Sequence, residues 1–402
     1  IRILDNKIAS IQEAGTTVFN ENSEKINAEG YWISPGFMDL RANFRDPGFE
    51  TKEDIESGAD AAAAGGFTKV AVLPELNPIA QNKSDISYLI EKGKKTAVDI
   101  LPIAALSHNL EGKEISEMYD LKQAGAIAFS EGNNPVSSSG LLMRGLLYGK
   151  TFDALIMVSP EDKGISGKGQ MNESLQSVIL GMKGIPNLTE VLAIKRDLEL
   201  LRYTESKIHF SHISSKEAVN LIAQAKKEGL KVTCDVAAHQ LLYTDSELKD
   251  YNTNFKVKPP FRSEGDREAL IDGILNGIID VIISDHQPED LEHKEVEFEY
   301  AAPGIASIQT VLHFIIEGLA DKFNPDLVVQ TLSVNPRKIS GLEIAKIAEN
   351  ENAELVIWSN EKSWLYNSKS NKSKAVNNPL WNTEIKGKVL GTFHKNKWNQ
   401  NN

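Results

Sequence analysis

Short apolar runs alternate with helical stretches over most of the chain. Helical stretches such as 55–64, 216–227 and 266–275 stand between several of the runs. A short apolar run bounded by turn residues is typical of a buried strand, and helices between such strands favour a parallel sheet. The pattern therefore predicts an α/β fold, a (β/α)8 barrel over residues 34–349, with its functional site at the carboxyl ends of the strands. The eight expected strands are 32–39, 67–73, 98–105, 126–130, 154–159, 207–214, 231–237 and 279–285.

Both ends of the chain have a different pattern, with short alternating segments typical of strands. These segments predict one small β module formed by residues 1–33 and 350–402. Residues 305–342 are expected to be helical, and 359–378, rich in Ser, Asn and Lys, to form a loop. The expected strands of the module are 1–4, 7–11, 17–19, 354–358 and 386–393.

Composition narrows the classes of partner and compartment. The 402 residues carry a net charge of −12, which argues against a nucleic-acid partner. Cys234 is the single cysteine, so a reducing, cytoplasmic location is expected. No apolar run reaches the roughly 18 residues of a membrane span, so no membrane partner is expected. Ile1 already lies within an alternating pattern, from which we expect a preceding piece of chain to be missing.

Polar residues alternate along the stretch 34–48, directly after an apolar run that ends at Pro35-Gly36. Side chains two residues apart on a strand share a face, so these polar groups are expected to point the same way. An apolar strand ending in a row of polar groups is typical of the working end of a barrel strand. The four residues are Asp39, Arg41, Asn43 and Arg45.

This stretch resembles the first-strand signature of the dihydroorotases and other cyclic amidohydrolases, Pro-Gly-Phe-x-Asp-x-His-x-His-x-Arg-x-Pro-Gly. The two histidines, which bind metal in the family, are replaced by Arg41 and Asn43. The likeness extends over nearly the whole chain and is closest to the long bacterial dihydroorotases, which include non-catalytic members that associate with aspartate transcarbamoylase. Further matches are Met171-Asn-Glu173, Gly184-Ile-Pro186, His209-x-x-His212-Ile-Ser214, Pro259-Pro260-x-Arg262, Ser284-Asp285-His286 and Ala302-Pro-Gly304.

The resemblance implies a metal that polarises the substrate amide and activates a water. Of the family's ligand positions, His212 and Asp285 survive, and Glu131 is a possible third. Ser159 stands where another histidine is usual, and Arg41 and Asn43 replace the first pair. A catalytic zinc ion needs at least three protein ligands, so no metal cofactor is expected and Asp285 is interpreted as a vestigial catalytic residue.

Other histidines are weak substitutes. His209 lies three residues from His212, a spacing that predicts the opposite face of the strand, outside the barrel. His239 could face the pocket at the end of the seventh strand, although a hydrogen-bonded structural role is the more common alternative. His286 is expected to point away from Asp285. The remaining four are interpreted as surface or packing residues: His108, His293, His313 and His394.

The substrate-binding positions implied by the resemblance are also altered. Arg45, the vestigial substrate-binding arginine, is kept and is suited to grip a carboxylate. Glu75, Lys258 and Glu289 replace an asparagine, a second asparagine and a histidine. The favoured interpretation of Arg45 is therefore an ordinary salt bridge, to Asp46 or to Glu75.

Two functions compete. The first is a catalytically inactive dihydroorotase-like protein of pyrimidine biosynthesis, which serves as a structural or regulatory partner, as a homo-oligomer or with aspartate transcarbamoylase. The second is an active, zinc-dependent cyclic amidohydrolase whose metal site is rearranged around His212, His239, Asp285 and Glu131. A third, weaker hypothesis is a binding protein for a small ligand. The first is favoured, because a fold supports a scaffold but only a site supports chemistry.

The first hypothesis predicts a specific contact. Strands one and eight are neighbours in a closed barrel, so Arg41 and Asp285 arrive side by side. A carboxylate inside the barrel mouth is costly unless it is paired. We therefore expect the guanidinium of Arg41 to occupy roughly the place of the metal, to pair with Asp285 and to reach Glu131, with His212 nearby.

Overall fold

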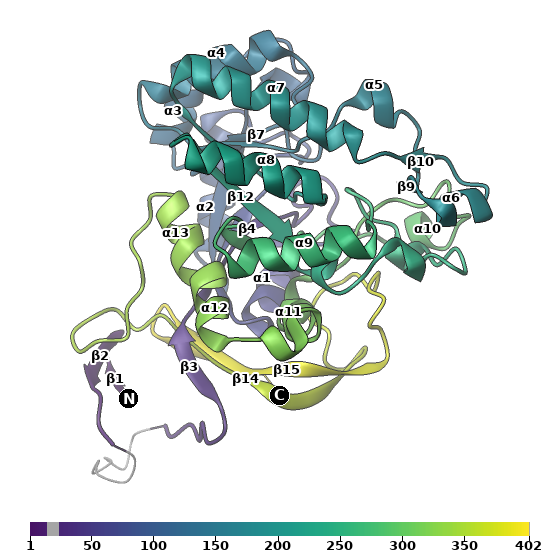
Figure 1. Cartoon of the computed structure of the whole chain (residues 1–402). Helices are drawn as coiled ribbons and strands as arrows, with labels where there is room; N and C mark the ends of the chain where they lie inside the picture. Colours follow the sequence, from purple (N-terminus) through teal and green to yellow (C-terminus); the bar gives the residue numbers. More distant parts are fainter. Residues whose placement is uncertain (14–23, 402) are drawn as a thin grey trace.

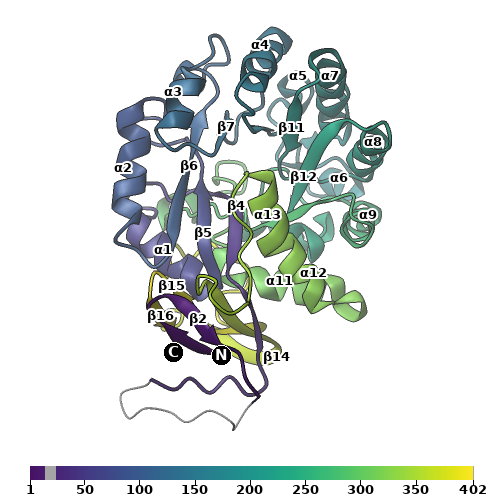
Figure 2. The ribbon, with the colours of Figure 1, turned by 90° about the vertical axis from the view of Figure 1, so that its left-hand side faces the viewer.

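The computed structural model describes residues 1–13 and 24–401, and its centre is an eight-stranded parallel sheet (Figures 1 and 2). The strands are hydrogen-bonded in chain order, with β4 at one end and β13 at the other. The predicted (β/α)8 class is confirmed, whereas the predicted strand 17–19 lies outside the described residues. The sheet consists of β4 (Phe37–Ala42), β5 (Phe67–Val72), β6 (Asp99–Ala105), β7 (Ala128–Ser130), β8 (Ile156–Val158), β11 (Lys207–Phe210), β12 (Lys231–Ala237) and β13 (Val281–Ile283).

Helices connect successive strands and cover the outside of the sheet (Figure 2). Helix α1 begins where Asp54 and Ser57 form a reciprocal capping box and ends at the predicted Gly65-Gly66. The α-helices are α1 (Ile55–Ala64), α2 (Lys83–Gly93), α3 (Met118–Gln123), α4 (Ser139–Lys150), α5 (Lys163–Ser166), α6 (Leu175–Ile179), α7 (Leu188–Thr204), α8 (Lys216–Lys227), α9 (Glu264–Leu275), α10 (Leu291–Lys294), α11 (Val311–Leu319), α12 (Pro325–Val329) and α13 (Asn335–Ile339). Shorter 3-10 turns are His108–Leu110, Ala238–Leu241, Asp245–Glu247, Thr253–Phe255, Ile308–Thr310 and Ala320–Lys322, and Gln330–Val334 is a π-helical turn.

The barrel closes between its first and last strands, β4 and β13. The backbone N–H of Asn43 donates to the carbonyl of His286 at 2.9 Å. The carboxylate of Asp39 accepts from the backbone N–H of Ser284 at 3.0 Å and from its hydroxyl. Burial raises the pKa of Asp39 to about 7, although the hydrogen bonds from Ser284 oppose this shift. Side chains therefore complete a seam that has few backbone hydrogen bonds.

A second sheet combines one strand that precedes the barrel with three strands that follow it. It is antiparallel, in the order β16-β15-β14-β3 (Figure 1). The predicted first barrel strand, 32–39, is in fact two strands, because its first part pairs with β14 and only its second part enters the barrel. The strands are β3 (Trp32–Pro35), β14 (Leu355–Tyr366), β15 (Thr383–His394) and β16 (Lys397–Gln400), and β1 (Arg2–Leu4) pairs with β2 (Lys7–Ser10) in a separate hairpin.

The predicted loop 359–378 is wrong in its first part, because β14 continues to Tyr366. Residues 367–378 form an irregular segment whose polar side chains hydrogen-bond to backbone carbonyl groups of the barrel loops. Asn377 donates to the carbonyls of Gln287 and Gly304, each at 3.0 Å, and Asn378 donates to the carbonyl of Ala306. The two asparagines therefore hold this segment against the loop that follows β13.

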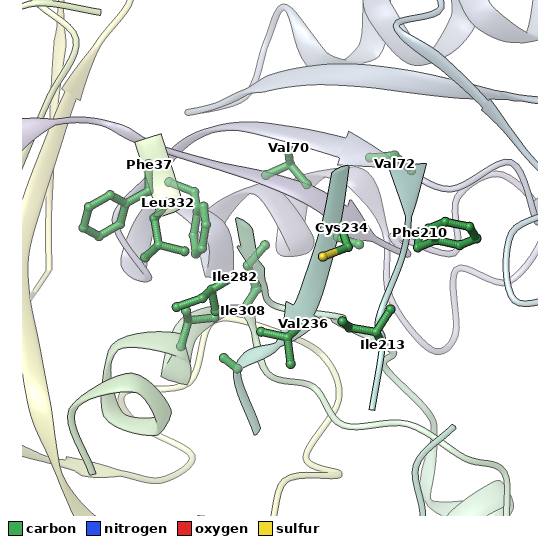
Figure 3. Packing of buried hydrophobic residues seen from close by; sticks show 14 of the residues in the cluster. Phe37, Val70, Val72, Phe210, Ile213, Cys234, Val236, Ile282, Ile308 and Leu332 are labelled. Atoms are coloured by element: carbon green, nitrogen blue, oxygen red, sulfur yellow. The ribbon is translucent and has the colours of Figure 1, made fainter. Parts of the chain in front are cut away.

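Apolar side chains fill two layers. The barrel interior is packed by residues such as Met38, Leu40, Met157 and Ile283. The layer between strands and helices is larger, and Figure 3 shows part of it. Cys234 lies in that outer layer, fully buried, and burial raises the pKa of its thiol well above the usual range. The labelled residues of Figure 3 are Phe37, Val70, Val72, Phe210, Ile213, Cys234, Val236, Ile282, Ile308 and Leu332.

Across residues 1–13 and 24–401, every helix is too short or too polar to cross a membrane.

A buried ion pair joins the second sheet to the barrel. The guanidinium of Arg337 contacts the carboxylate of Glu354 and donates to the Ser333 carbonyl at 2.9 Å. The hydroxyl of Thr68 donates to the same carboxylate at 2.6 Å. Burial alone would raise the pKa of Glu354, but Arg337 and Lys69 more than reverse this and hold it below its ordinary value.

We predict that Arg337→Ala destabilises the fold by about 3 kcal/mol, because it leaves Glu354 without its main partner in a poorly solvated place. Urea unfolding at pH 7 measures the change. Since the folded pKa of Glu354 is lowered, the stability from this pair is present above the unfolded pKa near 4.3 and is lost as the pH falls below it. A variant as stable as the wild type at pH 7 would contradict the prediction.

Candidate functional site

Arg41, Asn43, His212 and Asp285 meet at the barrel mouth, whereas Asp39 and His209 lie on other faces than those predicted for them. Asp39 does not share a face with Arg41, because a register shift lies between Asp39 and Ala42 in the pairing of β4 with β5. His209 lies inside the barrel, not outside, because it pairs with the interior residue Met157 while its neighbours on β11 pack in the outer layer.

Arg41 lies at the centre of the mouth and has no solvent exposure. Its Nε donates to Oδ1 of Asp285 at 3.0 Å. Its Nη2 donates to Oδ1 of Asn133 at 2.6 Å and to the carbonyl of Gly132 at 3.4 Å. The predicted pairing with Asp285 is therefore confirmed, and the guanidinium bonds the loop after β7 through Asn133 and Gly132.

Glu131 is turned away from Arg41. Its carboxylate accepts from the backbone N–H of Ser107 at 2.7 Å and from the Ser107 hydroxyl at 2.8 Å, so it holds the end of β6. Burial raises the pKa of Glu131, and the two bonds from Ser107 work against that shift. The expected contact between Arg41 and Glu131 is wrong, because Ser107 already satisfies both carboxylate oxygens.

Asn43 and Ser159, at two former ligand positions, make local bonds. The side-chain oxygen of Asn43 accepts from the backbone N–H of Arg45 at 2.9 Å. The hydroxyl of Ser159 donates to the carbonyl of Gly132 at 2.8 Å. Both side chains therefore fix backbone near the mouth.

Two buried histidines lie near Asp285. Burial and then the charge of Arg41 lower the pKa of His212 to about 3, and burial lowers that of His239 to about 4. His239 Nε2 is 3.9 Å from Oδ2 of Asp285, and its ring packs edge-on against Phe261. Within the described residues neither nitrogen of His239 has a protein hydrogen-bond partner, and its ring is a buried, neutral imidazole that faces Asp285.

Arg45 pairs with Glu289 and not with Asp46 or Glu75, which corrects its expected partner. Its Nη2 lies 2.6 Å from Oε1 of Glu289, and Lys52 Nζ lies 2.5 Å from the other oxygen. Asp46 instead pairs with Lys92. Arg45, the arginine that the resemblance assigns to an anionic substrate, is therefore already paired with the carboxylate of Glu289.

The other altered positions are also paired within the chain. Glu75 accepts from Asn133 Nδ2 at 2.7 Å, and burial raises its pKa while Arg41 lowers it. Lys258 Nζ lies 2.7 Å from Oε2 of Glu161. The cavity beside His212, with Ser159 and Lys258 in its lining, has a volume of about 30 Å³, room for two or three water molecules.

Sequence reasoning missed the partners supplied by loops, namely Asn133, Ser107 and Lys52. One signal points to the first of them. Gly132 adopts φ +65°, and a Cβ there would lie 2.4 Å from Cδ of Glu75, so only glycine lets this turn bring Asn133 over Arg41. Nothing in the local sequence marks Ser107 or Lys52 as part of the mouth.

The side chains at the mouth do not fit a zinc ion. Among the described residues, no three His, Cys, Asp or Glu side chains are placed to hold one metal. Oδ1 of Asp285, where the resemblance implies a ligand, is bonded by the guanidinium of Arg41, and this fixed positive charge repels a metal as well as blocking a ligand.

The parallel barrel, the capping second sheet and the residues at the strand ends define an amidohydrolase-type fold. Residues 30–218 match the dihydro-orotase-like family and residues 184–397 the amidohydrolase family. Dihydroorotases of Acetivibrio thermocellus and Syntrophus aciditrophicus are each 38% identical to this chain, over 95% and 97% of its length and 91% and 92% of theirs. The chain belongs to the dihydroorotase-like family of amidohydrolases.

Solved structures agree on the fold. The L-hydantoinase (dihydropyrimidinase) from Arthrobacter aurescens superposes with a TM-score of 0.85 at 23% identity, covering 98% of this chain and 91% of that chain. The dihydropyrimidinase from Brevibacillus agri NCHU1002 gives 0.81 at 20% identity, covering 98% and 90%. At this identity the likeness concerns the fold alone.

We predict that Arg41→Ala destabilises the protein by about 3–5 kcal/mol, because it leaves the buried carboxylate of Asp285 without its charged partner. Arg41→Lys should recover part of the loss, since it keeps the charge without the planar fork that reaches Asn133 and Gly132. Urea unfolding followed by tryptophan fluorescence measures both variants. If the free energy of unfolding of Arg41→Ala lay within about 0.5 kcal/mol of the wild-type value, the Arg41–Asp285 pair would contribute nothing measurable to stability.

Proposed function

We propose that this protein is a member of the dihydroorotase-like family that serves pyrimidine biosynthesis without catalysing the ring hydrolysis itself. Its role is that of a structural or regulatory partner in the cytoplasm. The observation that carries this proposal is the Arg41–Asp285 pair, which places a permanent cation against a surviving ligand position. Catalysis in this family needs that carboxylate free for a metal.

The substrate side of the pocket supports the same proposal. A dihydroorotase acts on an anionic substrate, and here Arg45 is already neutralised by Glu289, which is itself shared with Lys52. An incoming carboxylate would have to displace a charge-assisted pair that is mostly buried. Among the described residues at the mouth, the arginine suited to the substrate and one oxygen of the Asp285 carboxylate are therefore both engaged within the chain.

The second candidate is an active cyclic amidohydrolase with a rearranged zinc site, and the names of the relatives favour it. Both relatives named above are called dihydroorotase. The neutral imidazoles of His212 and His239 are also in the protonation state that zinc requires. Against this candidate, Arg41 would have to leave Asp285 before any metal could use that carboxylate.

As partners we propose aspartate transcarbamoylase, further copies of this chain, or both. This rests on the resemblance to non-catalytic members of the family and on a general expectation, since a scaffold kept without chemistry is kept for its surface. A homo-oligomer would by default have closed two-fold symmetry. Co-sedimentation of the purified protein with purified aspartate transcarbamoylase tests the first of these partners.

We predict no formation or hydrolysis of dihydroorotate above the uncatalysed background, with or without added zinc. The double variant Arg41→His, Asn43→His should remain inactive, because Glu289 still occupies Arg45 and Ser159 and Glu131 still make their local bonds. A relative named dihydroorotase, assayed in parallel, is the positive control. Substantial turnover by the wild type would establish the second candidate, and turnover by the double variant alone would show that two imidazoles suffice.

We predict no stoichiometric zinc in protein purified without chelator. Elemental analysis measures the ratio of metal to chain, and added zinc should leave the thermal midpoint unchanged, because a ligand that does not bind the native state does not stabilise it. The double variant Arg41→His, Asn43→His should take up more zinc than the wild type, since it loses a cation and gains two ligands. About one zinc per wild-type chain would contradict the prediction.

A further inference from the structure

Two buried lysines join the two long loops at the barrel mouth. The loop after β12 spans residues 238–263 and carries Lys256. The loop after β13 spans residues 284–310, includes α10 and carries Lys294 at the end of that helix. The two residues are only 7% and 4% exposed. Lysine is rarely buried to this extent unless its charge is paired, so these two side chains need an explanation.

Each ammonium group reaches into the opposite loop. Nζ of Lys256 donates to the carbonyls of Phe298 and Glu299, at 2.6 and 3.0 Å. Nζ of Lys294 donates to the carbonyl of Thr253 at 2.6 Å and also bonds two carbonyls of its own loop. The two side chains therefore hold the loops together from both sides.

These contacts lack the negative charge that usually accompanies a buried lysine. Within the described part of the chain, both ammonium groups bond carbonyl oxygens and neither forms an ion pair with a carboxylate. Burial lowers the pKa of Lys256 to about 8, although the charge of Glu299 opposes the shift. Burial also lowers the pKa of Lys294 to about 8, where Glu289 opposes the shift and Lys256 adds to it. A buried charge without a counter-charge favours the neutral form of the group.

We propose that Lys256 and Lys294 form a proton-sensitive clamp, which holds the two loops together most firmly when both side chains are neutral. A neutral amine keeps two N–H donors, enough for the two carbonyls that Lys256 contacts, and buries no charge. When the loops separate, water solvates both groups and their pKa returns to about 10.4. Between about pH 8 and about pH 10.4 the separated state binds more protons, so the closed state gains stability as the pH rises through this range.

The clamp bears on the mouth because the same two loops supply residues to it. Lys258 lines the small mouth cavity, and Glu289 pairs with Arg45. Separation of the loops therefore widens the cavity and loosens the hold of Glu289 on the arginine. The Arg41–Asp285 pair takes no part in the clamp, so the activity assay and the test of the clamp fail separately.

Hydrogen exchange of the Gly304 amide measures the separation, because its N–H donates across the two loops to the carbonyl of Lys256 at 2.8 Å. The protection factor, the intrinsic exchange rate divided by the observed one, corrects for the pH dependence of the exchange chemistry. From about pH 7 to about pH 9 this factor should rise at least about tenfold, the change that one such lysine produces. A factor that stays constant or falls, or an equal rise in β14 and β15, would overturn the proposal.

Lys256→Met and Lys294→Met test the two side chains separately, because methionine keeps a long unbranched chain and takes up no proton. Each variant should reduce the rise in protection at Gly304, and the double variant should abolish it. Lys322→Met is the matched control, since the Lys322 side chain is 49% exposed and pairs with Asp272, and it should keep the wild-type rise. A double variant that keeps the wild-type rise would contradict the clamp.

Direct titration of the wild type gives a second readout that does not depend on the folding of any variant. With lysine labelled with carbon-13 at the ε position, two resonances should titrate near pH 8. The resonances of exposed lysines should titrate near about pH 10.4, the ordinary value. If every lysine resonance titrates near that ordinary value, the proposal is wrong.

Discussion

The ion pair between Arg41 and Asp285 is the interaction on which the barrel mouth depends. It joins the first strand to the last, where few backbone hydrogen bonds complete the ladder and where Asp39 and Ser284 supply the neighbouring contact. Burying a charge is expensive unless its partner and its remaining hydrogen bonds are supplied. Asn133 and Gly132 supply two of them, so one guanidinium organises both the seam and the loop after β7.

The same geometry explains why the mouth satisfies its own charges. Glu289 neutralises Arg45, Ser107 binds Glu131, and the amide of Asn133 bonds Glu75. Each pairing engages a group that could otherwise bind a ligand. The family fold is intact while the residues that would act on a substrate are engaged with one another, which is the physical basis of the proposed loss of catalysis.

In a barrel the residues at the mouth and the residues on the outer surface belong to different parts of the fold, and this chain has that arrangement. Strands and outer helices form the packed body, whereas the mouth is made from loops. Changes at Arg41 or Glu289 therefore need not alter the outer helices. The second sheet is bound to the same body through Arg337 and Glu354, and Asn377 between β14 and β15 also bonds a loop at the mouth.

The sequence by itself determined the barrel, because alternating apolar runs and capped helices leave few other ways to bury them. It also determined that Arg41 meets Asp285, since strands one and eight must be neighbours in any closed barrel. Only the tertiary structure decided the other partners. Glu289 pairs with Arg45, Ser107 holds Glu131, and His209 faces inward. The first two contacts depend on the paths of loops. His209 faces inward although His212 lies three residues on, because β11 ends at Phe210 and strand alternation does not extend to His212.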